Sequence, residues 1–502
     1  MITKVILMLL FFGIMIAVGI YSRKHAANVN GFVLGGRKVG PWMTAFAYGT
    51  SYFSAVVFIG YAGQFGWKYG MASTWIGIGN AIIGSLLAWV VLGRRTRIMT
   101  KAMDSATMPD FFGKRYESNV LKIAASAIVF VFLIPYTASV YNGLSNLFEM
   151  AFNIDYRICV VVMATLTGAY VILGGYMATA INDFIQGIFM LVGIVAVIIC
   201  VLNGQGGFSA AVSSLSQIES DIPATAGQVG AFTSVLGTDP KNLLGVVILT
   251  SLGTWGLPQM VGKFYAIDGD KSIKIGTIVS TVFAVIISGG SYFLGGFGRL
   301  FDSPAIYKAD GSIAFDKIVP SMLSTLPDIL MGVVIVLVLS ASMSTLSSLV
   351  LTSSSTLTLD MIQGGLKKKM DNKQQLLVLR IFIVFFIAVS VIIALDPPTF
   401  IAQLMGISWG ALAGAFLAPF LYGLYWKGVT KLSVWVTFIF GVGVTVANMY
   451  LNFFDSSINC GAFAMLGGLV LVPVVSWLTP KKYKMDAAKT EELFTCYQRS
   501  EL

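Results

Sequence analysis

Long apolar runs separated by short polar stretches repeat along the whole chain. Each run is about twenty residues long, which as a helix is enough to cross about 30 Å of hydrocarbon. We predict thirteen membrane-spanning helices, and the chain is therefore expected to be an all-α polytopic membrane protein. The predicted helices cover residues 5–22, 41–62, 72–93, 120–148, 157–174, 178–203, 243–262, 272–298, 327–353, 375–396, 398–425, 431–451 and 461–478.

The composition agrees with a single transmembrane domain. Of the 502 residues, 56% are hydrophobic and 11% are charged, which is far from the average of soluble domains. We expect residues 1–480 to form the transmembrane domain and residues 481–502 to form a short cytoplasmic tail. The four cysteines are scattered without metal-binding or disulfide spacing. Neither a cofactor nor a metal centre other than a sodium site is expected.

The net charge of +10 is concentrated on one side of the predicted membrane. About four in five of the 33 lysines and arginines lie after residue 480 or in the loops 23–40, 94–122, 263–274, 367–380 and 427–431. Cytoplasmic loops carry such an excess of basic residues. We predict a multi-pass protein of the plasma membrane with its N-terminus outside and its C-terminus in the cytoplasm. The basic residues are therefore explained by membrane topology and do not indicate binding of nucleic acid.

Two of the predicted helices contain residues that interrupt a helix. Residues 47–55 are small and polar in the middle of a run, and residues 251–259 contain two glycines and Pro258. These runs open two successive blocks of five helices, 41–203 and 243–425. Interruptions at matching places in two halves are typical of transporters with inverted repeats, whose sites lie at the interruptions. The alternative is that these residues only allow close helix packing.

The run 327–353 carries an unusual group of hydroxyls. Five serines and a threonine lie between Ser340 and Ser348, directly after an apolar stretch. Buried hydroxyls cost free energy unless they find partners, and helical spacing places several of these on neighbouring faces. Such oxygens suit a small hard cation that must be released again. The alternative is that each hydroxyl bonds to a carbonyl of its own helix.

An acidic residue, Asp183, lies several positions inside the run 178–203. Intramembrane carboxylates are costly and usually face an ion path or a partner. The alternative is a shallower helix start, at which Asp183 would be a solvated residue of the first turn.

Four segments together resemble the sodium:solute symporter family. They are the serine-rich stretch 341–348, residues 174–186, the segment Phe32–Arg37 and the segment Gly423–Lys427. The resemblance covers residues 5–480. It implies a leucine-transporter-like fold of two inverted five-helix repeats, 41–203 and 243–425, with one extra helix at 5–22 and two further helices within 431–478.

The resemblance also implies a sodium site between the first interrupted helix and the serine-rich helix. Its ligands would be the carbonyls of Thr50, Phe53 and Ala341 and the hydroxyls of Ser344 and Thr345. Neutral oxygens bind a monovalent cation weakly enough for release into the cytoplasm. Members similar to the sialic acid symporter hold a second sodium ion, and the matching positions here are Asp183, Ser347 and Ser348. Asp183 could equally serve the exit path of a single ion.

The solute is expected to be a small organic acid. The family's proline symporters have an acidic residue where this chain has Tyr52, and the pantothenate symporter resembles this chain more at the two interruptions. We therefore predict pantothenate or a related carboxylate as the solute, with a proline-type amino acid as the alternative. An aromatic and amide pocket without fixed charge is expected to be lined by Phe53, Tyr136, Tyr141, Thr254, Trp255, Gln259 and Gln403.

Sodium-coupled import by alternating access is the predicted mechanism, and no enzyme activity is expected because no nucleophile–base pair is evident. The expected partners are sodium, the solute and membrane lipid, with the protein a monomer or a weak oligomer. A transporter-like solute sensor and a sodium channel are the alternatives from a different class. The sensor would be expected to carry a long soluble signalling domain.

Overall fold

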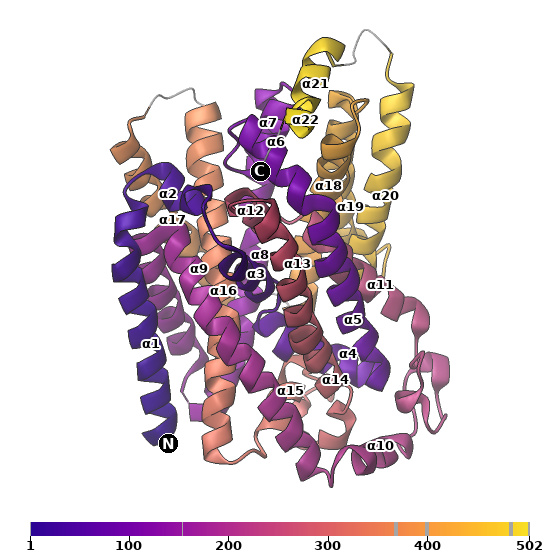
Figure 1. Ribbon diagram of the computed structural model, residues 1–502. Helices are drawn as coiled ribbons and strands as arrows, with labels where there is room; N and C mark the ends of the chain where they lie inside the picture. The colour runs from indigo at the N-terminus through magenta and orange to yellow at the C-terminus, as the bar shows by residue number, and fades with distance from the viewer. Residues whose placement is uncertain (1, 153, 366–369, 397–400, 481–484, 500–502) are drawn as a thin grey trace.

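The computed structural model of the protein describes residues 2–152, 154–365, 370–396, 401–480 and 485–499. These residues form a bundle of helices (Figure 1). Among them, eleven helices are long and apolar enough to cross a membrane. The prediction of an all-helical polytopic protein is confirmed. Residues 398–400 of one predicted helix, residues 367–369 of a predicted cytoplasmic loop, and residues 481–484 and 500–502 of the predicted tail lie outside the described part.

The count of eleven differs from the predicted thirteen because two of the helical segments are very long. Val56–Ala102 and Tyr156–Gly204 contain 47 and 49 residues, whereas about twenty residues suffice for one crossing. Each contains a glycine in a conformation outside the helical region. Gly70 has φ 60° and ψ −140°, and Gly175 has φ 54° and ψ −145°. The count of thirteen crossings stays a prediction.

Both predicted interruptions are present. Helix α3 (Pro41–Tyr52) ends at Phe53, whose φ of −105° and ψ of 88° are not helical, and the chain resumes helical structure before α4 (Ala62–Tyr69). Helix α11 (Pro240–Leu252) passes through a short 3₁₀ turn at Gly253–Trp255 before α12 (Pro258–Ala266). Pro258 lacks a backbone N–H and stands at the first position of α12, where that N–H would have no helical partner.

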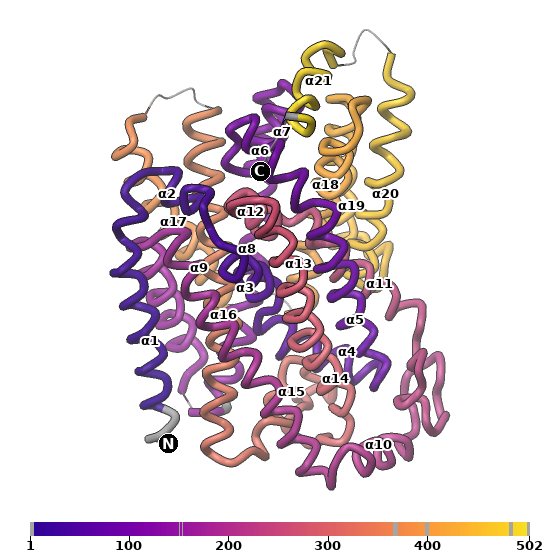
Figure 2. Tube along the Cα trace, viewed as in Figure 1, coloured from indigo at the N-terminus to yellow at the C-terminus, as the bar shows by residue number. Residues whose placement is uncertain are grey.

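Helix α16 (Asp328–Ser355) runs through the middle of the bundle (Figure 2). Every residue from 334 to 351 is buried, as expected of a helix that is enclosed on all sides. It packs against α9 (Tyr156–Gly204), α8 (Asn119–Phe152), α1 (Ile2–Ser22) and α3. The serine-rich stretch therefore lies in the interior of the protein and not against lipid.

The remaining helices complete the bundle around this centre. Helix α18 packs against α8, α19 and α20, and α17 is largely exposed, as expected at a lipid-facing position. The bounds of the other described α-helices are α2 Val29–Leu34, α5 Thr74–Gly79, α6 Arg94–Ala102, α7 Met108–Arg115, α10 Phe208–Ser216, α13 Asp270–Ala284, α14 Gly290–Gly295, α15 Ile318–Leu323, α17 Asn372–Leu395, α18 Ile401–Tyr425, α19 Lys431–Leu451, α20 Ser457–Leu478, α21 Ala487–Phe494 and α22 Cys496–Arg499.

The two ends of the bundle differ in charge. Helix α1 begins at the lower end in Figure 1, where α10 also lies, while α6, α7 and α21 lie at the upper end. Helix α6 opens with Arg94 and Arg95, and Lys427 pairs with Glu491 of α21 at 2.6 Å. The upper end is thus the one whose loops were predicted to be cytoplasmic, and this orientation stays a prediction.

Candidate functional site

Four of the five predicted sodium ligands lie close together where the first interrupted helix, α3, contacts α16. The hydroxyls of Ser344 and Thr345 each donate a hydrogen bond to the carbonyl of Thr50, both at 3.1 Å. They also reach the carbonyl of Ala341, at 3.2 and 3.1 Å. All four residues are buried. Two carbonyl and two hydroxyl oxygens from helices far apart in sequence therefore converge on one point.

The fifth predicted ligand lies beside this cluster. Phe53 and Ala341 line the same small apolar cavity, together with Ser54 and Leu337. The Phe53 ring stacks on Tyr52 with ring centroids 4.1 Å apart. Because Phe53 stands where α3 ends, its carbonyl lies outside regular helical structure.

The hydroxyls of α16 differ in the partners that they bond to. Ser342 donates to Val338 at 2.7 Å and Ser347 donates to Ser344 at 2.9 Å, both carbonyls of their own helix. For these two serines the alternative of internal bonding is confirmed. Ser344 and Thr345 bond within α16 and also across to α3. A hydroxyl donates its proton to a carbonyl while its lone pairs remain available to a cation.

Asp183 is fully buried on α9, and the alternative of a solvated residue at a helix start is wrong. The helix resumes after Gly175, so Asp183 stands two turns inside it. Its carboxylate lies 3.7 Å from the ammonium of Lys263. Among the described residues, neither of its oxygens has a hydrogen-bond partner.

Lys263 was expected in the loop 263–274, and that expectation is wrong. The residue lies within α12 and is 3% exposed. Its ammonium donates to the hydroxyl of Ser348 at 2.9 Å, and the Ser348 hydroxyl is 2.7 Å from that of Ser51 on α3. The sequence near Lys263 shows only a lysine at the end of an apolar run. It does not show that the carboxylate of Asp183, on another helix, pairs with this lysine.

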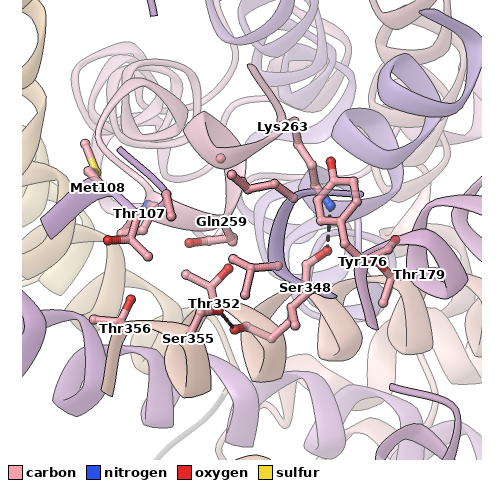
Figure 3. A pocket seen from close by; sticks show the side chains of 16 residues that line it. Thr107, Met108, Tyr176, Thr179, Gln259, Lys263, Ser348, Thr352, Ser355 and Thr356 are labelled. Carbon is pink, nitrogen blue, oxygen red and sulfur yellow. Dashed lines mark hydrogen bonds between the residues drawn. The ribbon is translucent and has the colours of Figure 1, made fainter. Parts of the chain in front are cut away.

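A cavity lies beside Lys263 (Figure 3). Two of the elements that line it, α2 and α7, lie toward the upper end of the bundle in Figure 1. In the close-up, the Lys263 side chain points toward Ser348, with Tyr176 beside it and Gln259 on the same wall. The cavity is lined by residues of α2, α7, α9, α12 and α16. Ser348, one helical turn from Ser344, is among its lining residues.

Part of the predicted solute pocket forms an aromatic group around the first interruption. The rings of Tyr136 and Trp409 meet edge to face with centroids 5.9 Å apart. The ring centroids of Trp409 and Tyr52 are 6.1 Å apart. Tyr52 donates to the carbonyl of Thr250 on α11 at 2.5 Å. The hydroxyl of Tyr136 is buried and has no partner among the described residues.

The other predicted solute residues make separate contacts. Thr254 donates to the carbonyl of Gly84, and the indole of Trp255 donates to Ile83, so both lie against the helical segment after α5. Gln259 lines the cavity on the predicted cytoplasmic side. The carbonyl of Gln403, at the start of α18, accepts from Ser457 at 3.4 Å.

Tyr141 lies on α8 and is fully buried. Its hydroxyl has no partner in the part of the chain that the structure describes.

A second buried polar group lies near the predicted cytoplasmic end and was not predicted. Lys122 bridges Asp110 at 2.7 Å and Asp360 at 3.2 Å, and Thr107 donates to Asp360 at 2.5 Å. Burial alone would raise the pKa of Asp110, but the ammonium groups of Lys122 and Lys114 outweigh it, so that pKa lies below its usual range. The described residues hold no group of three or more His, Cys, Asp or Glu that could bind a metal ion.

Comparisons with known proteins assign the chain to a family. The model of the sodium:solute symporter family matches residues 32–441. The chain belongs to the sodium:solute symporter family. This symporter is similar to a sodium/proline symporter of Staphylococcus aureus (strain JH9), with 30% identity over 97% of this chain and 94% of the relative. The proteins of strains JH1 and Mu3 match equally.

Solved structures show the fold of the symporter. A sodium-coupled sialic acid symporter in a substrate-bound outward-open state has a TM-score of 0.76 at 16% identity, covering 96% of this chain and 99% of that chain. A nucleobase-cation-symport-1 family transporter has a TM-score of 0.50 at 13% identity, covering 92% and 98%. Both have the leucine-transporter fold, and they are transporters and not enzymes. Membership of the family supports sodium-coupled symport across a membrane.

Proposed function

We propose that this symporter imports a small organic solute together with sodium bound by Thr50, Phe53, Ala341, Ser344 and Thr345. The observation that carries the proposal is that the hydroxyls of Ser344 and Thr345 both reach the carbonyl of Thr50. An interrupted helix offers a carbonyl without a helical partner, and the enclosed helix α16 offers hydroxyls at the same point.

Sodium at this point would hold the end of α3 against α16. The ligands carry no net charge, so affinity stays modest and the ion can leave where sodium is scarce. Sodium binding would order the residues around Phe53 and complete the solute pocket. By linkage, a solute that is bound more tightly in the presence of sodium must raise the affinity for sodium by the same factor.

The solute pocket is proposed at the aromatic group of Phe53, Tyr52, Tyr136 and Trp409. The unpartnered Tyr136 hydroxyl supports this position, because a buried polar group without a partner is costly unless a ligand uses it. Helix ends at the two interruptions provide backbone N–H groups that can receive a carboxylate. Gln259 and Gln403 are then expected on the paths that lead to and from the pocket, on opposite sides of it.

A carboxylate-bearing solute fits this pocket best. Pantothenate or a related small acid stays the prediction from the sequence, and a proline-type amino acid is the alternative. The relatives described above are sodium/proline symporters, which makes proline the first solute to test. Both solutes carry the carboxylate that the helix ends would receive.

Reconstituted protein tests the proposal. Purified symporter in proteoliposomes is given an inward sodium gradient and is screened with proline, pantothenate, short monocarboxylates, sialic acid and sugars. Uptake of solute that requires sodium, together with solute-stimulated uptake of radiolabelled sodium, is the expected result. A sodium current without any solute would favour a channel instead, and solute binding without uptake would favour a sensor.

The proposed site in the cell is the plasma membrane, with the N-terminus outside and the C-terminus in the cytoplasm. The basic upper end of the bundle supports this orientation. The functional unit is proposed to be a monomer or a weak oligomer, because the two interruptions and the proposed sodium ligands all come from one chain.

A further inference from the structure

Lys263 places a positive charge at the buried carboxylate of Asp183. The Lys263 ammonium lies 2.9 Å from the Ser348 hydroxyl, 3.7 Å from Asp183 and 5.4 Å from the centre of the Tyr176 ring. Asp183 is fully buried, and Lys263 is 3% exposed. Two opposite charges that leave water together in this way neutralise each other, whereas either one alone would be strongly destabilising.

Asp183 and Ser348 are two of the positions that the family resemblance assigned to a second sodium ion. An ammonium group carries the charge of a sodium ion and donates up to three hydrogen bonds to surrounding oxygens. It differs from sodium in being tied to α12 by its own side chain. A sodium ion that joined Lys263 here would place two like charges against a single carboxylate.

We propose that the Lys263 ammonium is the resident second cation of this symporter, so that one sodium ion is bound per transport cycle. The inference rests on the proposed function and adds its stoichiometry. A bound sodium ion crosses with the solute, but the lysine remains with the protein. The Lys263 ammonium therefore neutralises Asp183 throughout the transport cycle. Because it stays with the protein, it adds nothing to the charge that is transported across the membrane in each cycle.

Lys263 also connects the interrupted helices to the enclosed helix of the proposed sodium site. Lys263 joins α12 to α9 through Asp183 and to α16 through Ser348. The Ser348 hydroxyl in turn contacts Ser51, the residue after Thr50 in α3. Both interrupted helices are thus connected to α16 within one helical turn of the proposed sodium ligands. The lysine supplies the cation at this connection.

Counting bound sodium ions in purified protein tests the proposal. Equilibrium binding of radiolabelled sodium is measured for the wild-type protein, for Lys263→Met and for the double variant Lys263→Met/Asp183→Asn. The expected counts per protein are one, two and one, because removal of the ammonium opens a carboxylate site that the second substitution closes. A wild-type count of two, or a Lys263→Met count that stays at one, would overturn the proposal.

A matched control and a second variant guard against trivial outcomes. Lys68→Met removes another largely buried lysine, which lies over the ring of Phe315, and is expected to leave the count at one. If Lys263→Met does not yield folded protein, Asp183→Asn alone decides. Asp183→Asn is expected to bind one sodium ion per protein and to turn over more slowly, because Lys263 is left unpaired. A count of zero would place the only sodium ion at Asp183 and would overturn the proposal. Wild-type protein that binds no sodium would instead reject the proposed function itself.

Discussion

The hydroxyl of Thr345 on α16 donates to the carbonyl of Thr50 on α3 at 3.1 Å, although 295 positions separate them. The Thr50 carbonyl lies in the last turn before the helix ends at Phe53. A fully enclosed helix and an interrupted helix thus share the oxygens that the family resemblance assigned to sodium. This relationship is the basis of the first prediction.

Replacing the Thr345 hydroxyl with a methyl group should weaken sodium binding. Thr345→Val keeps the volume and removes one oxygen from the proposed ligand set. If the free energy of sodium binding falls by about 1.4 kcal/mol or more, the sodium concentration for half-maximal uptake rises at least about tenfold. Ser342→Ala is the matched control, because the Ser342 hydroxyl bonds only to Val338 of its own helix. Equal effects of the two substitutions would place sodium elsewhere.

The Tyr52–Thr250 hydrogen bond should couple the two interruptions. Tyr52→Phe leaves the buried Thr250 carbonyl without this donor, which costs about 1–3 kcal/mol of unfolding free energy. We expect a lower melting temperature and a higher KM for the solute. Tyr422→Phe removes a comparable bond to Leu469, between α18 and α20. That control should lower stability alone, and a KM shift in both variants would refute a specific role of Tyr52.

Gly175 should be required for the turn inside α9. Its φ of 54° with ψ of −145° is accessible to glycine and strained for other residues, and an added Cβ would lie 2.7 Å from the carbonyl oxygen of Phe32. Gly175→Ala is expected to destabilise the protein by several kcal/mol, on the order of 2–4. Gly204→Ala, where nothing lies within 4 Å of the new methyl group, should be neutral in the same thermal unfolding assay.

Asp316 should make stability depend on pH. Burial raises the pKa of Asp316 to about 6, although the backbone N–H of Ile401 partly opposes this. A carboxyl whose pKa is higher in the folded state contributes stability at low pH, and that contribution is lost as the pH rises through about 6. The melting temperature should therefore fall as the pH rises from the ordinary carboxyl pKa of 3.8 to the folded-state pKa of about 6, and should level off above it. Asp316→Asn should reduce this slope.

The exposed Asp302 of the same loop provides the control for that measurement. Asp302→Asn removes a carboxylate at this exposed position and is measured in parallel with Asp316→Asn. An unaltered slope in Asp316→Asn would show that another group titrates in this range.

The sequence predicted the parts of the structure that depend on local properties. The interruptions at Phe53 and Gly253–Trp255 follow from glycine, proline and small polar residues in apolar runs, because such residues break helices wherever they occur. The polar role of the serine-rich stretch of α16 could also be predicted from the sequence, because hydroxyls buried in hydrocarbon require partners. The sequence itself singled out Ser344 and Thr345, and resemblance to the family named Thr50 and Ala341.

Residues whose role depends on a distant partner could not be predicted in this way. Lys263 was assigned to a loop because nothing near it in the sequence shows that Asp183 and Ser348 receive its charge. Trp255 and Gln259 are neighbours along the chain, yet one bonds to Ile83 and the other lines the cavity. The side on which a helix residue faces is set by packing against other helices.

Hydropathy and backbone propensity are properties of short segments, and they alone determined that this protein is a helical membrane protein with two interrupted helices. The tertiary structure decided which oxygens and charges meet. Thr50 with Thr345, Tyr52 with Thr250, and Asp183 with Lys263 come from segments far apart in the chain. Their contacts exist because burial of polar groups in a membrane interior is tolerated only where a partner from another helix satisfies them.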